Sequence, residues 1–330
     1  MDTRKKWIDQ ARGLSIFLVV YGHNFPINEP YIYSFHVPLF FFIAGMFHPK
    51  KVTFETVKRR AKIILIPYFV WALALYLFWL FLGRNYGDSA EAGLSAIDNL
   101  IGIFYSQGGQ SYMDWGIPMW FLPCIFIVFL VFAAIQKIKN KMFANAGVFF
   151  IVLLGFMWPR LTGVHLPWSI DVALVSVGFY AVGGHLKSWL INLSKLNTAL
   201  LFILFFGIHF FTFYVNPEKV DMYRSIYGKE ALFFLSGLFG AMAYLLFFKL
   251  VPVFSFLAYL GRHTIVLLAA HVRMLTVVKL VLMVIFGMTV FEFTEIEKFG
   301  LAILQVLLVI PIIWLVNKYL PILDGKVTKS

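Results

Sequence analysis

Long apolar stretches recur from one end of this 330-residue sequence to the other, and they limit its fold more than any other feature. A helix that crosses a bilayer needs about 20 predominantly apolar residues. The ten stretches that we predict to be spans are residues 7–24, 33–48, 61–83, 118–137, 143–160, 168–187, 198–216, 231–250, 262–288 and 299–320. The predicted fold is therefore an all-α, polytopic integral membrane bundle, forming a single transmembrane domain over residues 1–330.

The composition excludes a soluble protein of this length. Hydrophobic residues make up 61% of the chain and charged residues 13%, and the mean hydropathy is +0.84. Soluble domains are about a quarter charged, so this chain has too little polar surface for one. The single cysteine, Cys124, excludes a disulfide within the chain and a multi-cysteine metal site. Because the histidines are scattered, we expect no metal site.

The basic residues predict how the bundle is oriented. An even number of spans puts both termini on one side, and 20 of the 28 Lys and Arg residues then fall on that side, against six on the other. Loops rich in Lys and Arg stay in the cytoplasm, so both termini are predicted to be cytoplasmic. The net charge of +12 then reflects a cytoplasmic face suited to anionic lipid or an anionic ligand, and nucleic acid is not an expected partner.

The first predicted span carries ionisable residues that are costly in lipid. Asp9 and Arg12 lie near its cytoplasmic end, and His23 follows Arg12 by eleven residues. At 3.6 residues per turn, Arg12 and His23 share nearly one helix face and lie roughly 16 Å apart along the axis. One interpretation is anchoring, with Arg12 reaching the inner interface and His23 at the outer one. The alternative is chemical, with His23 as a general base. Spacing alone leaves both open.

His36 begins the second span, after a turn with the sequence FPINEPYIY. Prolines and asparagines in that stretch are typical of a tight connection. A short connection can bring His23 and His36 toward one another, so His36 is a second candidate for the same site.

A basic cluster, Lys58, Arg59, Arg60 and Lys62, stands at the cytoplasmic start of the third span. It is either an anchor of the kind that the positive-inside rule describes or a clamp for phosphate. Arginine offers a planar fork that matches phosphate oxygens, and lysine offers a mobile point charge.

Two later segments hold further candidates. Trp115 and Trp120 are typical of either an interfacial aromatic belt or a stacking wall for a sugar. His271 lies about two turns into the ninth span, and Arg273 and Lys279 lie deeper, where at least one of them needs an interior partner.

Five segments in this order resemble the membrane acyltransferase family 3, whose members acylate bacterial surface glycans. The segments are WIDQARGLSIFLVVYGH, YSFHVPLFFFIAGMF, KRRAKIILIPYFVW, IPMWFLPCIF and YLGRHTIVLLAAH. Within the family, the chain is most similar to the fucose 4-O-acetylase-like branch. The resemblance implies a bacterial inner-membrane enzyme, an acyl-CoA donor (usually acetyl-CoA), a glycan or lipid-linked saccharide acceptor, and no tightly bound cofactor.

The resemblance also implies roles for individual residues. Arg12 and His23 match the family's basic residue and catalytic histidine. The family's paired arginines of the third span fall on Arg59 and Lys62, where the lysine keeps the charge and loses the fork. Arg60 could substitute for it, with Lys58 beside them in the expected CoA-binding cluster.

The hypothesis that follows is acyl transfer within the membrane bundle. CoA docks at the basic face, and its thioester arm reaches His23, which acts as general base on a sugar hydroxyl or carries the acyl group. His36 is expected to orient His23 or hold the acceptor. The expected supporting residues are Asp9 (paired with Arg12 or another nearby cation), Trp120, His271 (lining the tunnel) and Arg273. The rival hypothesis is a transporter or flippase, in which the same residues line a substrate path.

Overall fold

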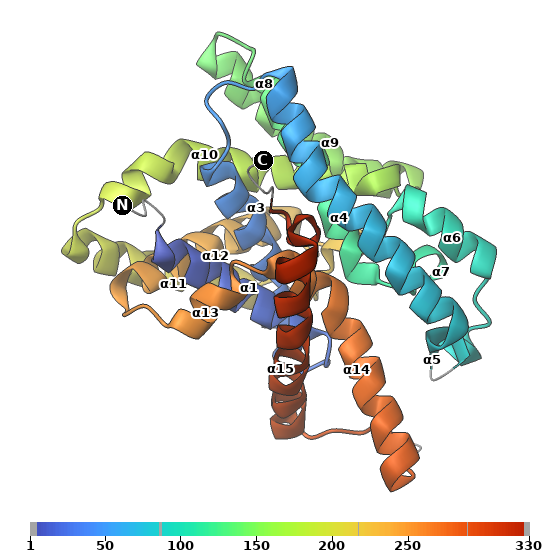
Figure 1. The fold of residues 1–330 in the computed structure, drawn as a ribbon. Coiled ribbons are helices and arrows are strands. Elements are labelled where there is room, and N and C mark those ends of the chain that lie inside the picture. Colours follow the sequence, from blue (N-terminus) through green and yellow to red (C-terminus); the bar gives the residue numbers. More distant parts are fainter. Residues whose placement is uncertain (1–4, 86–87, 217, 289, 327–330) are drawn as a thin grey trace.

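The computed structural model describes residues 5–85, 88–216, 218–288 and 290–326, which form an all-α bundle without strands (Figure 1). Eight helices of this described part are long and apolar enough to cross a membrane. They are α4 (Phe54–Phe81), α8 (Phe121–Ile135, extended by the 3-10 turn Ile117–Trp120), α9 (Lys141–Thr162), α10 (Ile170–Asn192), α11 (Lys195–Tyr214), α12 (Glu230–Leu250), α14 (Thr264–Phe286) and α15 (Glu295–Tyr319). The predicted all-α membrane bundle is confirmed.

The first two predicted spans correspond to short helices, one at the lower limit of a membrane span and the other below it. The first is α1 (Lys6–Gly22), with 17 residues, and the second reduces to α3 (His36–Met46), with 11. Residue 33 ends the short helix α2 (Glu29–Tyr33), and residues 34–35 turn the chain before α3 starts. Since 11 residues rise only about 16 Å, α3 covers about half of a hydrocarbon core of about 30 Å. The eight long helices thus differ from the ten predicted spans.

The remaining short helices lie in the connections. They are α5 (Asp88–Glu91), α6 (Ala96–Tyr105) and α7 (Gln110–Met113), between α4 and α8, and α13 (Ser255–Leu260), between α12 and α14. Figure 1 shows α14 and α15 side by side, with α4 crossing in front of the bundle.

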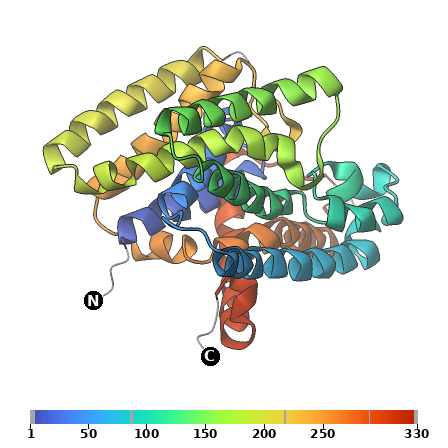
Figure 2. The same cartoon turned by 90° about the horizontal axis from the view of Figure 1, so that it is seen from above.

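Helix α1 lies inside the bundle, in contact with α3, α12, α13, α14 and α15. In Figure 2, α4 borders one side of the molecule, and α9 and α11 border the opposite side. These two outer helices expose large apolar side chains, among them Phe149, Phe150, Phe210 and Phe211. Such surfaces fit contact with lipid, whereas Asp9, Gln10 and Ser15 of α1 are buried inside the bundle.

Glycines let the two short helices approach their neighbours at backbone distance. A Cβ on Gly13 of α1 would lie 1.8 Å from the carbonyl oxygen of Leu257 in α13, and one on Gly261 would lie 1.9 Å from that of Asp9. Helix α3 crosses α10 in the same way, because a Cβ on Gly45 would lie 1.9 Å from a carbonyl oxygen of α10. Small residues at helix crossings are typical of membrane bundles. They fix the positions of α1 and α3 here.

Candidate active site

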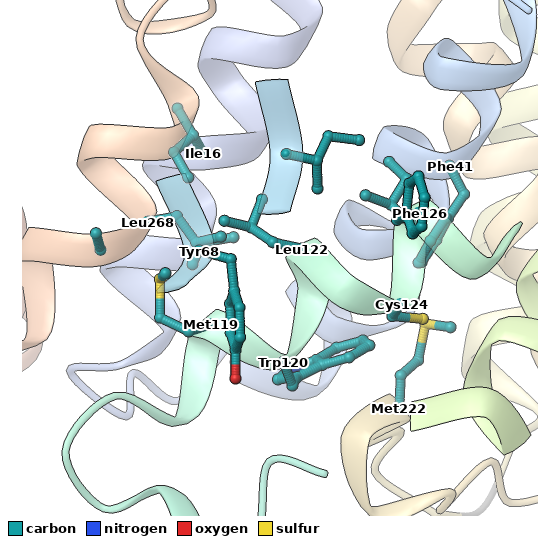
Figure 3. Packing of buried hydrophobic residues seen from close by; sticks show 14 of the residues in the cluster. Ile16, Phe41, Tyr68, Met119, Trp120, Leu122, Cys124, Phe126, Met222 and Leu268 are labelled. Carbon is teal, nitrogen blue, oxygen red and sulfur yellow. The ribbon is translucent and has the colours of Figure 1, made fainter. Parts of the chain in front are cut away.

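A cavity lies between α1, α3, α8, α14 and the loop that joins α11 to α12, with about 780 Å³ of empty space that includes its opening to the outside. Apolar side chains form most of its walls, including Ile16, Leu122 and Leu268, which Figure 3 shows gathered from three helices. The polar and ionisable residues that line it include His23, Tyr33, His36, Asp221, Tyr223 and Thr264. A mainly apolar pocket with a few polar groups is the usual form of a small-molecule site.

His23 follows the last turn of α1 and lines this cavity. Its Nδ1 lies 2.7 Å from the carbonyl oxygen of Val19. Because a carbonyl oxygen can only accept, neutral His23 carries its proton on Nδ1. Its Nε2 then bears the lone pair, and it makes no hydrogen bond within the described residues. His23 therefore has a nitrogen that is able to take a proton.

His36 lines the same cavity from α3. Its Nδ1 lies 2.7 Å from the carbonyl oxygen of Ile32, which fixes the same tautomer as in His23. The Ser15 hydroxyl donates to the carbonyl oxygen of His36 at 2.6 Å and ties α1 to α3. The turn between these helices thus brings both histidines to one cavity, as its length predicted.

His271 lies directly against His23. Its Nε2 is 3.3 Å from His23 Nδ1, and the ring centroids are 4.9 Å apart. The carbonyl oxygen of Leu267 accepts from His271 Nδ1 at 2.8 Å, so Nε2 holds the lone pair that faces His23. His271 is fully buried and is not part of the cavity wall, contrary to the predicted tunnel-lining position. It provides a second acceptor for the N–H of His23.

Arg12 lies about three turns from His23 on α1, roughly 16 Å along the axis. Its Nη2 donates to the Thr264 hydroxyl at 3.3 Å, and Thr264 lines the cavity. The guanidinium is thus linked to the cavity at a point far from the His23 imidazole. Asp9 is buried about one turn before Arg12, and the Asp9–Arg12 pair stays a prediction.

The comparison that decides the family covers nearly the whole chain. The family model of the acyltransferase domain, acyltransferase family 3, matches residues 5–318. The chain belongs to membrane acyltransferase family 3. No curated protein and no solved structure matches it. Since the match is to the family as a whole, the fucose 4-O-acetylase-like branch stays a prediction.

In this acyltransferase, the basic cluster lies in the first turns of α4, and its members differ in exposure. Lys58, Arg59 and Lys62 are exposed and make no hydrogen bond or ion pair within the described residues. Arg60 turns inward, with its guanidinium 5.5 Å from the centre of the Phe129 ring. None of the four lines the cavity as described. The predicted pair, Arg59 and Lys62, therefore faces outward, whereas Arg60 faces the protein.

Trp120 and Trp115 are both buried, so neither forms an interfacial belt. Trp120 lines the cavity of the acyltransferase, whereas Trp115 donates its indole N–H to the carbonyl oxygen of Asn99 at 2.9 Å. The sugar-wall interpretation stays open for Trp120 alone.

Arg273 has the interior partner that its depth required. Its buried guanidinium donates to the carbonyl oxygen of Asp114, whose carboxylate accepts from the Trp79 indole N–H at 2.6 Å. Arg273 lines neither this cavity nor the second one described below. In this position it joins α14 to the segment before α8.

Most residues of the cavity were absent from the sequence prediction, among them Tyr33 and Asp221. Tyr33 of α2 precedes His36 by three positions, a spacing that could have indicated a shared face. Asp221 comes from the loop after α11, and no local pattern predicts that this loop folds over the cavity. Burial raises the pKa of Asp221 to about 6.

This raised pKa predicts how Asp221→Asn changes stability with pH. The native protein holds the Asp221 proton more tightly than an unfolded chain does, because an unfolded aspartate has a pKa of 3.8. The stability of the wild type therefore falls as the pH rises from about 4 to about 6. The variant lacks this penalty and should be more stable than the wild type by about 1–3 kcal/mol at pH 7, with no gain at pH 4. Thermal unfolding in detergent at the two pH values measures the effect. An equal change at both would contradict the assignment.

Proposed function

We propose that this acyltransferase moves an acyl group, usually acetyl, from acyl-CoA to a hydroxyl of a cell-surface or exported glycan. The observation that carries the proposal is the cavity in which His23 and His36 meet, with Arg12 linked to it through Thr264. Family membership supports the transferase class. The geometry supports the choice of base.

His23 acts as the general base in this mechanism. The hydroxyl oxygen attacks the thioester carbonyl carbon, a C–O bond forms and the C–S bond breaks. The hydroxyl proton moves to His23 Nε2 and then to the departing CoA thiolate. As positive charge develops on the imidazole, its Nδ1–H is held by the carbonyl oxygen of Val19 and faces Nε2 of His271. These two acceptors stabilise the imidazolium, in the way that a triad carboxylate does.

His36 helps to hold the acceptor through a second hydroxyl of the sugar, next to the one that attacks. Because its Nδ1–H is used by the carbonyl oxygen of Ile32, neutral His36 offers a lone pair at Nε2, which can accept a hydrogen bond from this second hydroxyl. The attacking hydroxyl keeps its own proton for His23, and correct placement of reacting groups lowers the barrier substantially.

The donor docks at the Arg12 end. Lys58, Arg59 and Lys62 are exposed and make no ion pair within the described residues, which leaves them available for CoA phosphates. Arg12 and the inward-facing Arg60 add positive charge beneath this surface, and the acyl arm extends along the apolar cavity toward His23. We place this face in the cytoplasm of a bacterial inner membrane, with both termini, because the basic residues concentrate on that side.

The test is CoA release by protein reconstituted in nanodiscs. Acetyl-CoA is supplied with octyl glycosides of glucose, galactose, fucose or glucuronic acid as acceptors. Free CoA should appear at the rate at which an acetylated glycoside forms, and only with an acceptor. Movement of saccharide across vesicles without CoA release would contradict the proposal and favour a transporter.

His271 is a positioning residue in this account. His271→Phe keeps a buried ring and removes the acceptor that faces His23 Nδ1. We expect kcat to fall about 10-fold, which corresponds to the loss of one hydrogen bond to a charged group, with the KM for acetyl-CoA unchanged. A steady-state analysis separates the two constants. A rise in KM at constant kcat would assign His271 a role in binding instead.

A further inference from the structure

A second cavity touches His23 from another side. It is formed by the end of α1, the middle of α14, residues 291–293 and the start of α15, with about 690 Å³ of empty space that includes its opening to the outside. His23 lines both cavities, and the two linings share no other residue. His23 is therefore the residue at which the two spaces adjoin.

Two charged groups of this second cavity are available to a ligand. The ammonium of Lys279 lies over the Phe291 ring, 5.5 Å from its centre. Within the described residues no carboxylate lies within 4.0 Å of it, and Glu292 makes no ion pair. Lys279 and Glu292 thus line one space without neutralising one another. One can donate hydrogen bonds, and the other can accept them.

The other polar groups of the lining are already occupied. Asn24 donates to the carbonyl oxygen of Val20 at 3.0 Å and accepts from Gln305 at 2.9 Å. Lys298 is paired with Glu295 at 2.7 Å. These residues have a structural role in the lining, so the groups that can contact a ligand are Lys279, Glu292 and the free nitrogen of His23.

Aromatic rings complete the lining. Phe25, Phe291 and Phe293 contribute to it, together with Leu275. A saccharide matches this combination, because one face of a sugar ring is apolar and can pack on an aromatic ring. Its hydroxyls can donate to a carboxylate and accept from an ammonium group.

We propose that this second cavity binds the acceptor saccharide and that Lys279 determines its specificity. The proposal rests on the proposed function, in which His23 is the base. The acyl group reaches His23 through the first cavity, from the Arg12 end. The saccharide enters through the second cavity, at the opposite end of α1, and its reacting end passes His23 to meet the thioester and His36 in the first cavity. With the termini in the cytoplasm, the second cavity opens to the outer side.

The first test is Lys279→Met, which keeps the length of the side chain and removes its charge. The KM for the best octyl glycoside acceptor should rise about 10-fold, the cost of one hydrogen bond to a charged group, with the KM for acetyl-CoA unchanged. Lys318→Met is the matched control, because Lys318 also lies over an aromatic ring, that of Trp314, but outside both cavities. An unchanged acceptor KM in Lys279→Met would overturn the proposal.

The second test does not depend on the charge of Lys279. Leu275→Cys places a thiol in the lining, and the native Cys124 is fully buried and unreactive. A membrane-impermeant maleimide added outside right-side-out vesicles should label the variant and lower transfer more than 10-fold, while binding of radiolabelled acetyl-CoA persists. Val284→Cys, exposed on the same helix and outside both linings, should be labelled without loss of transfer. Labelling of Leu275→Cys without loss of transfer, or from the inner side only, would overturn the proposal.

The two proposals can fail separately. If Lys279→Met and the Leu275→Cys adduct leave transfer intact while His23→Ala abolishes it, only the saccharide site is wrong. If His23→Ala retains full transfer, the proposed base is wrong, whatever the second cavity binds.

Discussion

Replacing His23 with alanine is expected to lower the rate of acetyl transfer by about 10²- to 10⁴-fold, the usual contribution of a general base. The variant loses the side chain that, among the described residues, lines both cavities, together with its free imidazole nitrogen. The carbonyl oxygen of Val19 loses its bond from the imidazole but still accepts from the backbone N–H of residue 23. We therefore expect a folded, inactive protein, measured as CoA release at saturating acetyl-CoA.

His185→Ala is the matched control for this substitution. His185 of α10 makes the same local contact as His23, with Nδ1 2.6 Å from the carbonyl oxygen four residues earlier, and it lines neither cavity. Its loss should leave the transfer rate within about two-fold of the wild type. Equal losses in the two variants would mean that the histidines matter for the helices and not for the chemistry.

The second large effect is expected from Gly13→Val. Its Cβ would lie 1.8 Å from the carbonyl oxygen of Leu257, a backbone atom that cannot rotate away, so α1 and α13 would have to separate. Overpacking typically costs about 1–3 kcal/mol, and a clash with backbone belongs at the upper end of that range. Since α1 carries Arg12 and His23, both stability and activity should fall. The thermal midpoint and the monodisperse fraction after detergent extraction measure the loss.

Gly207→Val separates crowding from helix propensity. Gly207 also lies within a helix, α11, and a Cβ there would meet no atom within 4 Å. The same β-branched side chain should therefore change the thermal midpoint only slightly. A similar loss in both variants would show that valine destabilises these helices by itself, and the close crossing would not be the cause.

Hydropathy and periodicity predicted most of the fold. Eight of the predicted spans are long apolar helices, because uninterrupted runs of such length have few other stable forms in a membrane. The limits of α3 could not be predicted in this way. Residues 33–48 are apolar almost throughout, and apolarity does not show that Tyr33 ends one helix while His36 starts another. The turn is set by packing of α3 against α10.

The candidate site could likewise be predicted only in part. Arg12 and His23 share α1, and His36 follows a short turn, so local spacing was sufficient to relate them. The contact between His23 and His271 joins residues 248 positions apart and depends on how α1 packs on α14. Asp221 reaches the first cavity from a loop. Such long-range relations have no periodic signature in a single sequence.

The most direct test of the account is mass spectrometry of the acceptor after incubation with deuterium-labelled acetyl-CoA. The acceptor is the best octyl glycoside, and the wild type and His23→Ala are compared in nanodiscs at equal amounts of folded protein. We predict that the wild type adds one labelled acetyl group as a hydroxyl ester and that His23→Ala leaves the glycoside unchanged. Equal labelling by both proteins would contradict the role of His23 as the base.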